Sequence, residues 1–168
     1  MSIELPDLTI KPEEASEFYR LLGRALWAIG HFEYRLVHII VVVFKSPYSS
    51  RKAVDDALEK EFDKTLGELL KEFRRFCDIA PDVDERLDKF KSERNWLCHR
   101  IYQQNHTNLF NHVKLESLFL RLEVFKREST ELNDIFDQIF NQWRMKKKIS
   151  DEEMESRIKS TLNEWKNL

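Results

Sequence analysis

Apolar residues recur along most of the chain at the spacing of an α-helix, and this pattern predicts long amphipathic helices. The first predicted helix begins near Pro12, a residue suited to a first helical turn. The acids that follow, Glu13 and Glu14, lie where the helix dipole favours negative charge. Pro47 ends this helix. Its core face comprises Phe18, Leu22, Ala25, Ile29, Phe32, Leu36, Ile40 and Val43.

Two further helices are predicted from the middle of the chain. The second starts after Ser50 and continues to Phe76, with Gly67 as a point at which it bends or splits. Pro81 then breaks the chain. Asp82, with a glutamate three residues later, forms a capping arrangement at the start of the third helix.

The remaining sequence predicts a long fourth helix and a short last one. The third helix fades in the polar stretch 103–111, and the fourth runs from about His112 to Lys146. A serine with a glutamate three residues on opens the last helix, over residues 150–166. No strand-like alternation or internal repeat appears. We therefore expect an all-α fold, an antiparallel bundle of four to five helices that forms a single domain over residues 1–168.

The composition agrees with a folded helical protein and excludes one class of function. Hydrophobic residues make up 42% of the 168 residues, and only three glycines and four prolines are available for turns. The net charge is −2 and the sequence pI is about 6.2, whereas a domain that grips nucleic acid through many phosphates is normally basic. The charge excludes a globally cationic binder but leaves room for a local RNA site.

We expect a soluble, reduced, cytoplasmic protein with no membrane segment. Its cysteines, Cys77 and Cys98, are too few for a disulfide framework and form no Cys-x-x-Cys pair. Residues 1–7 include acids and no basic residue, which is not typical of a signal peptide. The longest apolar run, from Leu36 to Phe44, is short beside the about 20 residues that span a bilayer.

One position of the third helix conflicts with its apolar seam. At about 100° per residue, Arg94 lies on the same line as Leu87, Phe90 and Ile101. A guanidinium is rarely buried without a partner, because removing its hydration costs several kcal/mol. Glu33, at the rim of the first helix's apolar face, is a candidate partner that would orient the guanidinium. The alternative is that Glu33 is a solvated edge residue.

A second line of polar residues flanks this seam. Asn95, His99 and Tyr102 lie within about 60° of one another on a continuous helix. Asn95 and His99 face the same side, whereas Arg94 and His99 differ in direction by about 140°. These residues form the candidate site. The residues alone also allow a structural interpretation, in which His99 caps the helix end and Arg94 forms an ion pair.

Residues 94–99 read Arg-Asn-Trp-Leu-Cys-His. An Arg-Asn pair followed by three residues and a histidine, on the third helix of a small all-α domain, resembles the Arg-x4–6-His motif of HEPN domains. The chain is similar to small prokaryotic HEPN proteins over residues 13–145, with Glu33 placed on the first helix. The resemblance gives the single domain a core over residues 13–145, followed by the short helix 150–166.

The resemblance implies a metal-independent endoribonuclease of a toxin or antiviral defence system. His99 would act as general acid or base on the ribose 2′-OH and the leaving oxygen, Arg94 would stabilise the scissile phosphate, and Asn95 would position one of them. It also implies a homodimer with a composite cleft, an RNA substrate and an antitoxin or other regulatory protein partner. Ile101 takes the place of a tyrosine found in some members, and Tyr102 lies one residue further on.

Basic residues on the first helix are candidate RNA contacts. Arg20, Arg24, His31, Arg35 and His38 lie within about 60° of one another. Such a line can follow an RNA backbone, although charged helix faces are usually only solvated. Further basic candidates are Arg100, beside the motif, and the lysines 146–148 at the end of the fourth helix.

The sequence predicts no metal and no cofactor, because the five histidines have no ligand spacing of a known metal site and no Gly-rich phosphate loop occurs. The alternative function is a catalytically silent HEPN-like domain that binds RNA, a nucleotide or a protein partner. A third possibility is a purely structural interaction protein.

For a dimer, the expected contacts near the cleft are Trp96, Leu97 and Ile101.

Overall fold

The computed structural model describes residues 11–45, 51–105, 111–150, 152 and 156. Six α-helices and one π-helix account for most of them, and none of these residues forms a strand. The expected all-α bundle is therefore confirmed. The elements are α1 (Pro12–His38), η1 (Ile39–Phe44), α2 (Arg51–Phe62), α3 (Leu66–Phe76), α4 (Pro81–His99), α5 (Ile101–Asn105) and α6 (His112–Lys146).

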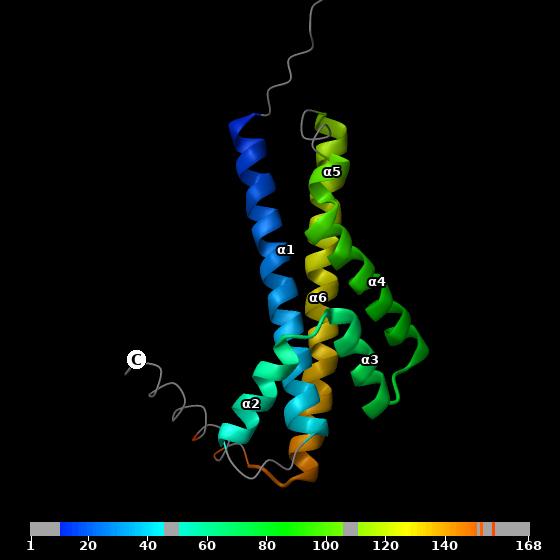
Figure 1. The fold of residues 1–168 in the computed structure, drawn as a ribbon. Helices are drawn as coiled ribbons and strands as arrows, with labels where there is room; N and C mark the ends of the chain where they lie inside the picture. Colours follow the sequence, from blue (N-terminus) through cyan, green and yellow to red (C-terminus); the bar gives the residue numbers. More distant parts are fainter. Residues whose placement is uncertain (1–10, 46–50, 106–110, 151, 153–155, 157–168) are drawn as a thin grey trace, which may run out of the picture.

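The long helices α1 and α6 lie side by side and run in the same direction (Figure 1). The direction follows from their contacts, which advance together along both helices. The Ser129 hydroxyl donates a hydrogen bond to the Ala28 carbonyl at 3.1 Å, and Arg35 pairs with Asp137 about two turns later. Helix α4 runs the opposite way beside α6. The bundle is thus antiparallel between α4 and α6 but parallel between its two longest helices.

Phenylalanine rings join four helices in the centre of the core. The ring centroid of Phe32 on α1 lies 4.3 Å from that of Phe90 on α4 and 5.1 Å from that of Phe136 on α6. Phe136 also contacts Phe73 of α3 at 5.5 Å. Each of the four residues is at most 1% exposed. Because an aromatic pair contributes about 0.5–1.5 kcal/mol beyond the burial of its area, this cluster fixes how α1, α3, α4 and α6 meet.

The helix boundaries confirm some predictions and correct others. Helix α6 has the predicted bounds, His112 to Lys146. The predicted second helix is two helices, and the break lies before Thr65, whose side chain and that of Glu68 form a reciprocal capping box. Gly67 is inside α3 and does not cause the break. The proposed capping role of Asp82 is wrong, because the N-cap residue is Ala80 and the chain enters α4 through proline. The predicted last helix lies outside the described residues.

Helix α1 passes into the π-helix η1, a run of Ile, Val and Phe residues. The Lys45 amide donates to the Ile40 carbonyl at 3.1 Å, which closes a wider turn than an α-helix makes. By length and composition, the stretch Pro12–Phe44 contains an 18-residue window with a mean hydropathy of 1.4 that suffices to cross a membrane. One such helix is weak evidence of a span, because the core helices of soluble proteins pass the same test.

Four charged side chains form a closed network at one end of the bundle: Glu61 of α2, Glu72 of α3, Lys45 just after η1 and Lys64 between α2 and α3. Lys45 lies 2.6 Å from an oxygen of Glu61 and 2.6 Å from one of Glu72. Lys64 pairs with the same two carboxylates at 2.8 Å and 2.6 Å. Glu61 is only 2% exposed. Burial of Glu72 favours its neutral form, but hydrogen bonds from the two lysines and Glu61 prevail and lower its pKa to about 2.

Candidate active site on α1 and α4

Arg94 of α4 and Glu33 of α1 form an ion pair, the first of the two alternatives that the sequence left open for Glu33. The Arg94 Nε donates to Glu33 Oε1 at 3.0 Å, and Nη2 lies at the same distance from that oxygen. Nη1 donates to the Asn95 side-chain oxygen at 3.4 Å. The side chains of Arg94 and Glu33 are 24% and 27% exposed. Because one carboxylate oxygen holds one edge of the guanidinium, some of its five N–H groups remain available to a ligand.

The interruption of the α4 seam has a simple geometric explanation. Leu87 and Phe90 are 1% exposed, while Arg94, on the same line, extends to the rim of the α1–α4 contact and meets Glu33. Leu97 continues the buried face and is 3% exposed. Arg94 therefore occupies a core direction without a fully buried charge, because the opposing carboxylate lies near solvent.

Trp96 anchors the end of α4 that carries His99. Its indole Nε1 donates to the Gln104 side-chain oxygen in α5 at 2.9 Å. The Arg121 guanidinium of α6 lies 3.5 Å from the centroid of the Trp96 ring, and its Nε and Nη2 donate to Glu93 at 2.7 Å and 2.8 Å. These contacts fix the last turns of α4 against α5 and α6, and the sequence analysis did not anticipate them.

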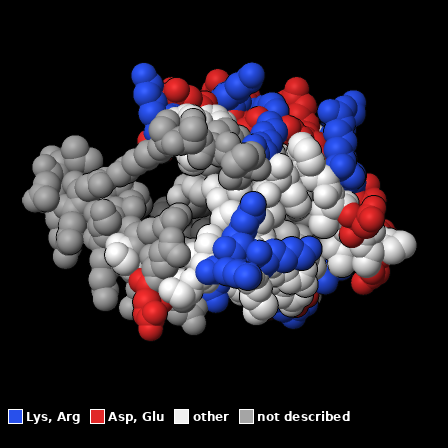
Figure 2. All heavy atoms as spheres, turned by 90° about the horizontal axis from the view of Figure 1, so that it is seen from below, with Lys and Arg blue, Asp and Glu red and all other residues white. Residues whose placement is uncertain are grey.

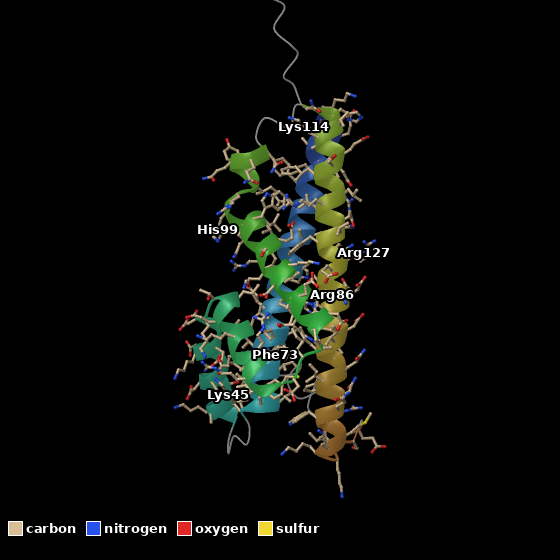
Figure 3. The ribbon with its side chains drawn as sticks, turned by 90° about the vertical axis from the view of Figure 1, so that its right-hand side faces the viewer. Lys45, Phe73, Arg86, His99, Lys114 and Arg127 are labelled. Atoms are coloured by element: carbon tan, nitrogen blue, oxygen red, sulfur yellow. The ribbon has the colours of Figure 1, made fainter. Side chains whose placement is uncertain are left out.

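His99 is the last residue of α4 and is exposed, as is Asn95 one turn before it. Figure 3 shows His99 at the outer edge of α4, on the side away from α6. Among the residues that the structure describes, His99 has no hydrogen-bond or ion-pair partner, so the proposed capping role finds no support there. Arg100 is the C-cap residue of α4, and Tyr102 lies in α5. The predicted alignment of Tyr102 with Asn95 and His99 assumed one continuous helix, and the break at Arg100 removes that premise.

The basic line of α1 lies on a different flank from Arg94. Arg35 pairs with Asp137 of α6, and the His31 Nδ1 lies 3.3 Å from the Asn133 side-chain nitrogen. Glu33, between them in sequence, faces α4 instead. In one protomer, the candidate RNA-binding residues of α1 and the motif residues of α4 are not brought together. Of the remaining basic candidates, Arg20 donates to Glu17, and the His38 ring lies against the Tyr34 carbonyl. Arg24 and Arg100 are exposed.

Charge of both signs is spread over the surface. Figure 2 views the molecule from the end at which α6 finishes and shows Lys and Arg side chains at the centre, with acidic ones beside basic ones at the rim. The lysines 146–148 at this end are exposed. This distribution agrees with the net charge of −2 and gives no broad cationic face on the described surface visible in that view.

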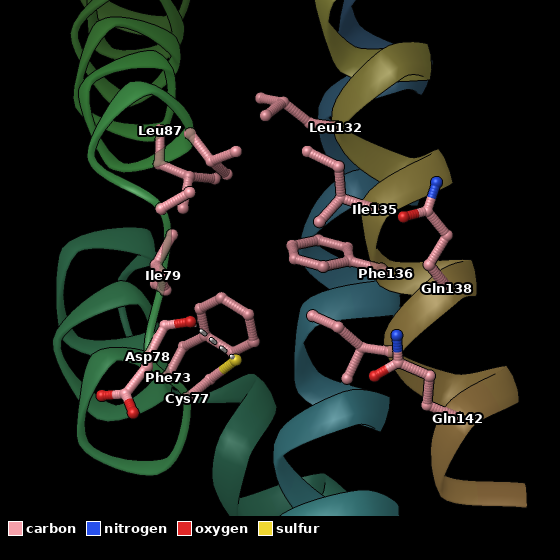
Figure 4. A pocket seen from close by; sticks show the side chains of 13 residues that line it. Phe73, Cys77, Asp78, Ile79, Leu87, Leu132, Ile135, Phe136, Gln138 and Gln142 are labelled. Atoms are coloured by element: carbon pink, nitrogen blue, oxygen red, sulfur yellow. Dashed lines mark hydrogen bonds between the residues drawn. The ribbon is translucent and has the colours of Figure 1, made fainter.

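An apolar cavity of about 430 Å³ lies between the α3–α4 connection and α6. Ile79 and Leu87 face Leu132 and Phe136 across it (Figure 4). The Cys77 thiol lies at this cavity, where burial, with a smaller contribution from the charge of Asp78, raises its pKa. Neither Arg94 nor His99 lines this cavity, so it is separate from the candidate site.

The expected dimer contacts need correction. Trp96 and Leu97 are 9% and 3% exposed within one protomer, so they are packing residues of the monomer and offer little surface to a partner. Ile101 is half-buried.

Among the described residues, no group of three or more His, Cys, Asp or Glu side chains is arranged to hold a metal ion.

The site thus consists of an oriented guanidinium, an amide and an exposed imidazole along one helix. A guanidinium binds phosphate oxygens, and an imidazole transfers protons near neutral pH. Together they suit the binding and cleavage of a phosphodiester. No family model, curated protein or solved structure matches the chain.

Proposed function

We propose that the chain is a metal-independent endoribonuclease of a toxin or defence system, similar to HEPN ribonucleases. The observation that carries the proposal is the contact of Glu33 with Arg94, which orients a guanidinium five residues before an exposed histidine on the same helix. Asn95 lies between these groups and accepts a hydrogen bond from Arg94. A donor that stabilises a phosphate in the transition state must be oriented before the substrate binds. Glu33 of α1 orients the Arg94 guanidinium of α4 in this way.

The chemistry follows from RNA itself. The ribose 2′-oxygen attacks the adjacent phosphorus, its proton passes to a base, and the bond to the 5′-oxygen breaks as that oxygen gains a proton. The products are a 2′,3′-cyclic phosphate and a 5′-hydroxyl. His99 takes or delivers one of these protons, Arg94 stabilises the negative charge on the phosphoryl oxygens, and Asn95 orients either group.

This division of roles favours a site shared by two protomers. Arg94 and His99 point about 140° apart around α4, and the reaction needs both a base and an acid. In a homodimer, His99 of each chain supplies one proton transfer, and the two copies of Arg94 flank the phosphate. A protein antitoxin or other regulator is the partner that would restrain such an activity in the cell.

The test is incubation of the purified protein with labelled tRNA and total RNA in EDTA. Cleavage should persist and leave 2′,3′-cyclic ends. His99→Ala should lower the rate at least about a hundredfold, the usual contribution of a general acid–base group. His112→Ala, at an exposed histidine on α6 that pairs with Glu14, is the matched control and should retain activity. Loss of cleavage on chelation, with recovery on adding magnesium, would contradict the proposal.

A second function, a catalytically silent domain that binds RNA, a nucleotide or a protein, is favoured by one feature of the same pair. Glu33 neutralises part of the charge that Arg94 offers to a phosphate. If the domain is silent, the wild-type protein cleaves no RNA, whereas RNA binding measured by fluorescence anisotropy still weakens in Arg94→Leu. The two functions therefore give opposite results in the cleavage assay.

A further inference from the structure

Helix α1 presents an apolar face that the described residues leave largely exposed. Trp27 is 81% exposed, Tyr19 69%, Tyr34 48% and Leu26 46%. Trp27 points away from the core face of α1, whereas Leu26 lies at the edge of this surface, close in direction to Glu33, which contacts α4. Soluble monomers rarely expose contiguous apolar patches larger than a few hundred Å² without a use for them. The face is therefore a candidate interaction surface.

Two glycines shape this face. Gly23 and Gly30 are seven residues apart on the same side of α1, with Trp27 between them. A Cβ added at either glycine would meet nothing within 4 Å, so no contact inside the protomer requires a glycine there. Each glycine weakens the helix by about 1 kcal/mol relative to alanine. Around them is an open hollow of about 610 Å³, lined by Gly23, Leu26, Trp27, Gly30, His31 and Tyr34.

We propose that the occupant of this face is a second copy of the chain, related by a two-fold axis. The face is self-complementary, because it offers both a protruding ring, Trp27, and the bare helix at Gly23 or Gly30 against which that ring packs. In a two-fold interface each protomer supplies both parts, so the same contact forms twice. The absence of Cβ atoms lets two α1 helices approach closely.

The area is sufficient for a dimer. Aromatic side chains cover about 150–250 Å² each, so the exposed fractions of Tyr19, Leu26, Trp27 and Tyr34, with the neighbouring Phe62, supply on the order of 600 Å² per protomer. Phe62 is 46% exposed and stacks on Tyr34, with ring centroids 5.8 Å apart. A standard interface buries about 800 Å² per partner, and the backbone of α1 at the glycines contributes part of the rest.

The observations favour a protein partner over RNA on this face. A surface that binds a single strand combines aromatic rings with free cations that contact phosphates. Of the arginines that line a hollow with Trp27, Arg20 pairs with Glu17, and Arg24 is an exposed cation at the edge of the face. The wall of the hollow is apolar except for His31.

This interface also completes the surroundings of the candidate site. Leu26 and Glu33 are seven residues apart and point within about 20° of each other, so a partner seated on Leu26 lies beside the Glu33–Arg94 pair. The interface replaces the contacts expected from Trp96 and Leu97. It does not rest on the proposed nuclease activity and is measured without it.

The experiment is sedimentation velocity of the full chain from about 0.5 to 50 µM, with circular dichroism to check folding. The wild type should be a dimer. Gly30→Leu should be monomeric yet fully helical, because the protomer has room for the side chain and leucine favours the helix. Trp27→Ala should raise the dissociation constant at least about thirtyfold, as for a residue at the centre of an interface. Leu120→Ala, at an exposed leucine on α6, is the control and should stay dimeric.

Three results would overturn the proposal. A monomeric wild type at 50 µM removes the second copy as occupant. A dimer that persists in both Gly30→Leu and Trp27→Ala places the interface elsewhere. A monomer that binds single-stranded RNA, or vesicles of phosphatidylcholine and phosphatidylglycerol, through Trp27 assigns the face to that ligand. RNA cleavage assays of the same variants report separately on the proposed function, because a dimer without nuclease activity leaves this inference intact.

Discussion

Two groups of charged residues join α1 and its continuation to neighbouring helices, and they differ in how completely their charges are satisfied. In the network of Lys45, Glu61, Lys64 and Glu72, each lysine contacts both carboxylates, and Glu61 is almost fully buried. In the pair of Glu33 with Arg94, one carboxylate oxygen holds part of one guanidinium, and both side chains are about a quarter exposed. Figure 3 shows Lys45 and His99 in opposite halves of the molecule.

The comparison shows how a charge that stabilises the fold differs from one that is available for chemistry. In the network, two buried carboxylates take up most of the N–H groups of both lysines, and removal of one member leaves the others uncompensated. A pair at the rim of the core keeps its geometry while some N–H groups still face solvent. In the sequence, the network and the Glu33–Arg94 pair look alike, because each places charged residues on an apolar helix. The structure distinguishes them by the number of partners that each charge has.

The largest expected effect separates activity from stability at the exposed pair. Arg94→Leu should lower RNA cleavage about 100- to 1000-fold, because a donor that stabilises transition-state charge is lost. The melting temperature should change by less than about 4 °C, since a partly exposed ion pair contributes about 1 kcal/mol or less and leucine packs on the α4 seam. Cleavage assays and circular dichroism melts measure the two quantities. A fall above about 8 °C, with a wild type inert toward RNA, would make the pair structural.

Removal of a carboxylate from the buried network should have the reverse effect. Glu61→Leu should destabilise the fold by about 3 kcal/mol, because Lys45 and Lys64 then share one carboxylate. For a chain of this length, this corresponds to a fall in melting temperature of about 6–12 °C. Cleavage per folded molecule should not change. Glu59→Leu, at an exposed glutamate of the same helix, is the control, and an equal shift in both variants would contradict the assignment.

The network should also determine how stability depends on acidity. The folded-state pKa of Glu72 is lowered from 4.5 to about 2, so its ionised form stabilises the fold above pH 4.5, and this contribution is lost as the pH falls from about 5 to 2. The loss amounts to about 3 kcal/mol or less, shared among the coupled groups. Urea unfolding across this range measures it. Glu72→Gln should flatten the slope, and an unchanged slope would contradict the prediction.

The smallest expected effect concerns the boundary that places Glu61 and Glu72 on separate helices. Thr65→Ala removes the capping box of α3 and should cost about 1 kcal/mol, or about 2–4 °C in melting temperature. Thr130→Ala is the control, because Thr130 lies inside α6 and its hydroxyl donates to the carbonyl of Lys126 four residues earlier. An alanine there should be neutral or slightly stabilising. Equal losses in the two variants would show that the cap contributes nothing.

The sequence predicted the features that depend on helical period. The bounds of α6 follow from its apolar spacing, and the contact of Glu33 with Arg94 follows from the directions of the two side chains on their helices. The break before Thr65 was also present in the sequence, as a threonine with a glutamate three residues later. The analysis chose Gly67 instead, although a single glycine is tolerated within a helix and a capping box starts a new one.

Other features depend on tertiary contacts that periodicity does not contain. Trp96 is buried because Arg121 and Gln104 lie across it, so a residue expected on an interface is part of the monomer. The parallel course of α1 and α6 depends on how the intervening helices fold back. The exposure of Trp27 follows from its position opposite the core face of α1 and was open to detection, since an aromatic residue on a polar face is itself a signal.

The pairing of α1 with α6 sets the order of events while the ribosome makes the chain. The hydrogen-bonded residues Ala28 and Ser129 are 101 positions apart, which at about 5–20 residues per second is an interval of about 5–20 s. Until α6 has left the ribosome, the apolar face of α1 that carries Phe32 and Leu36 lacks the helix that buries most of it. Contacts this distant in sequence form late, after the cost of closing a long loop. A nascent chain that stalls before His112 therefore holds an incomplete core, and it is the species that chaperones and proteases meet first.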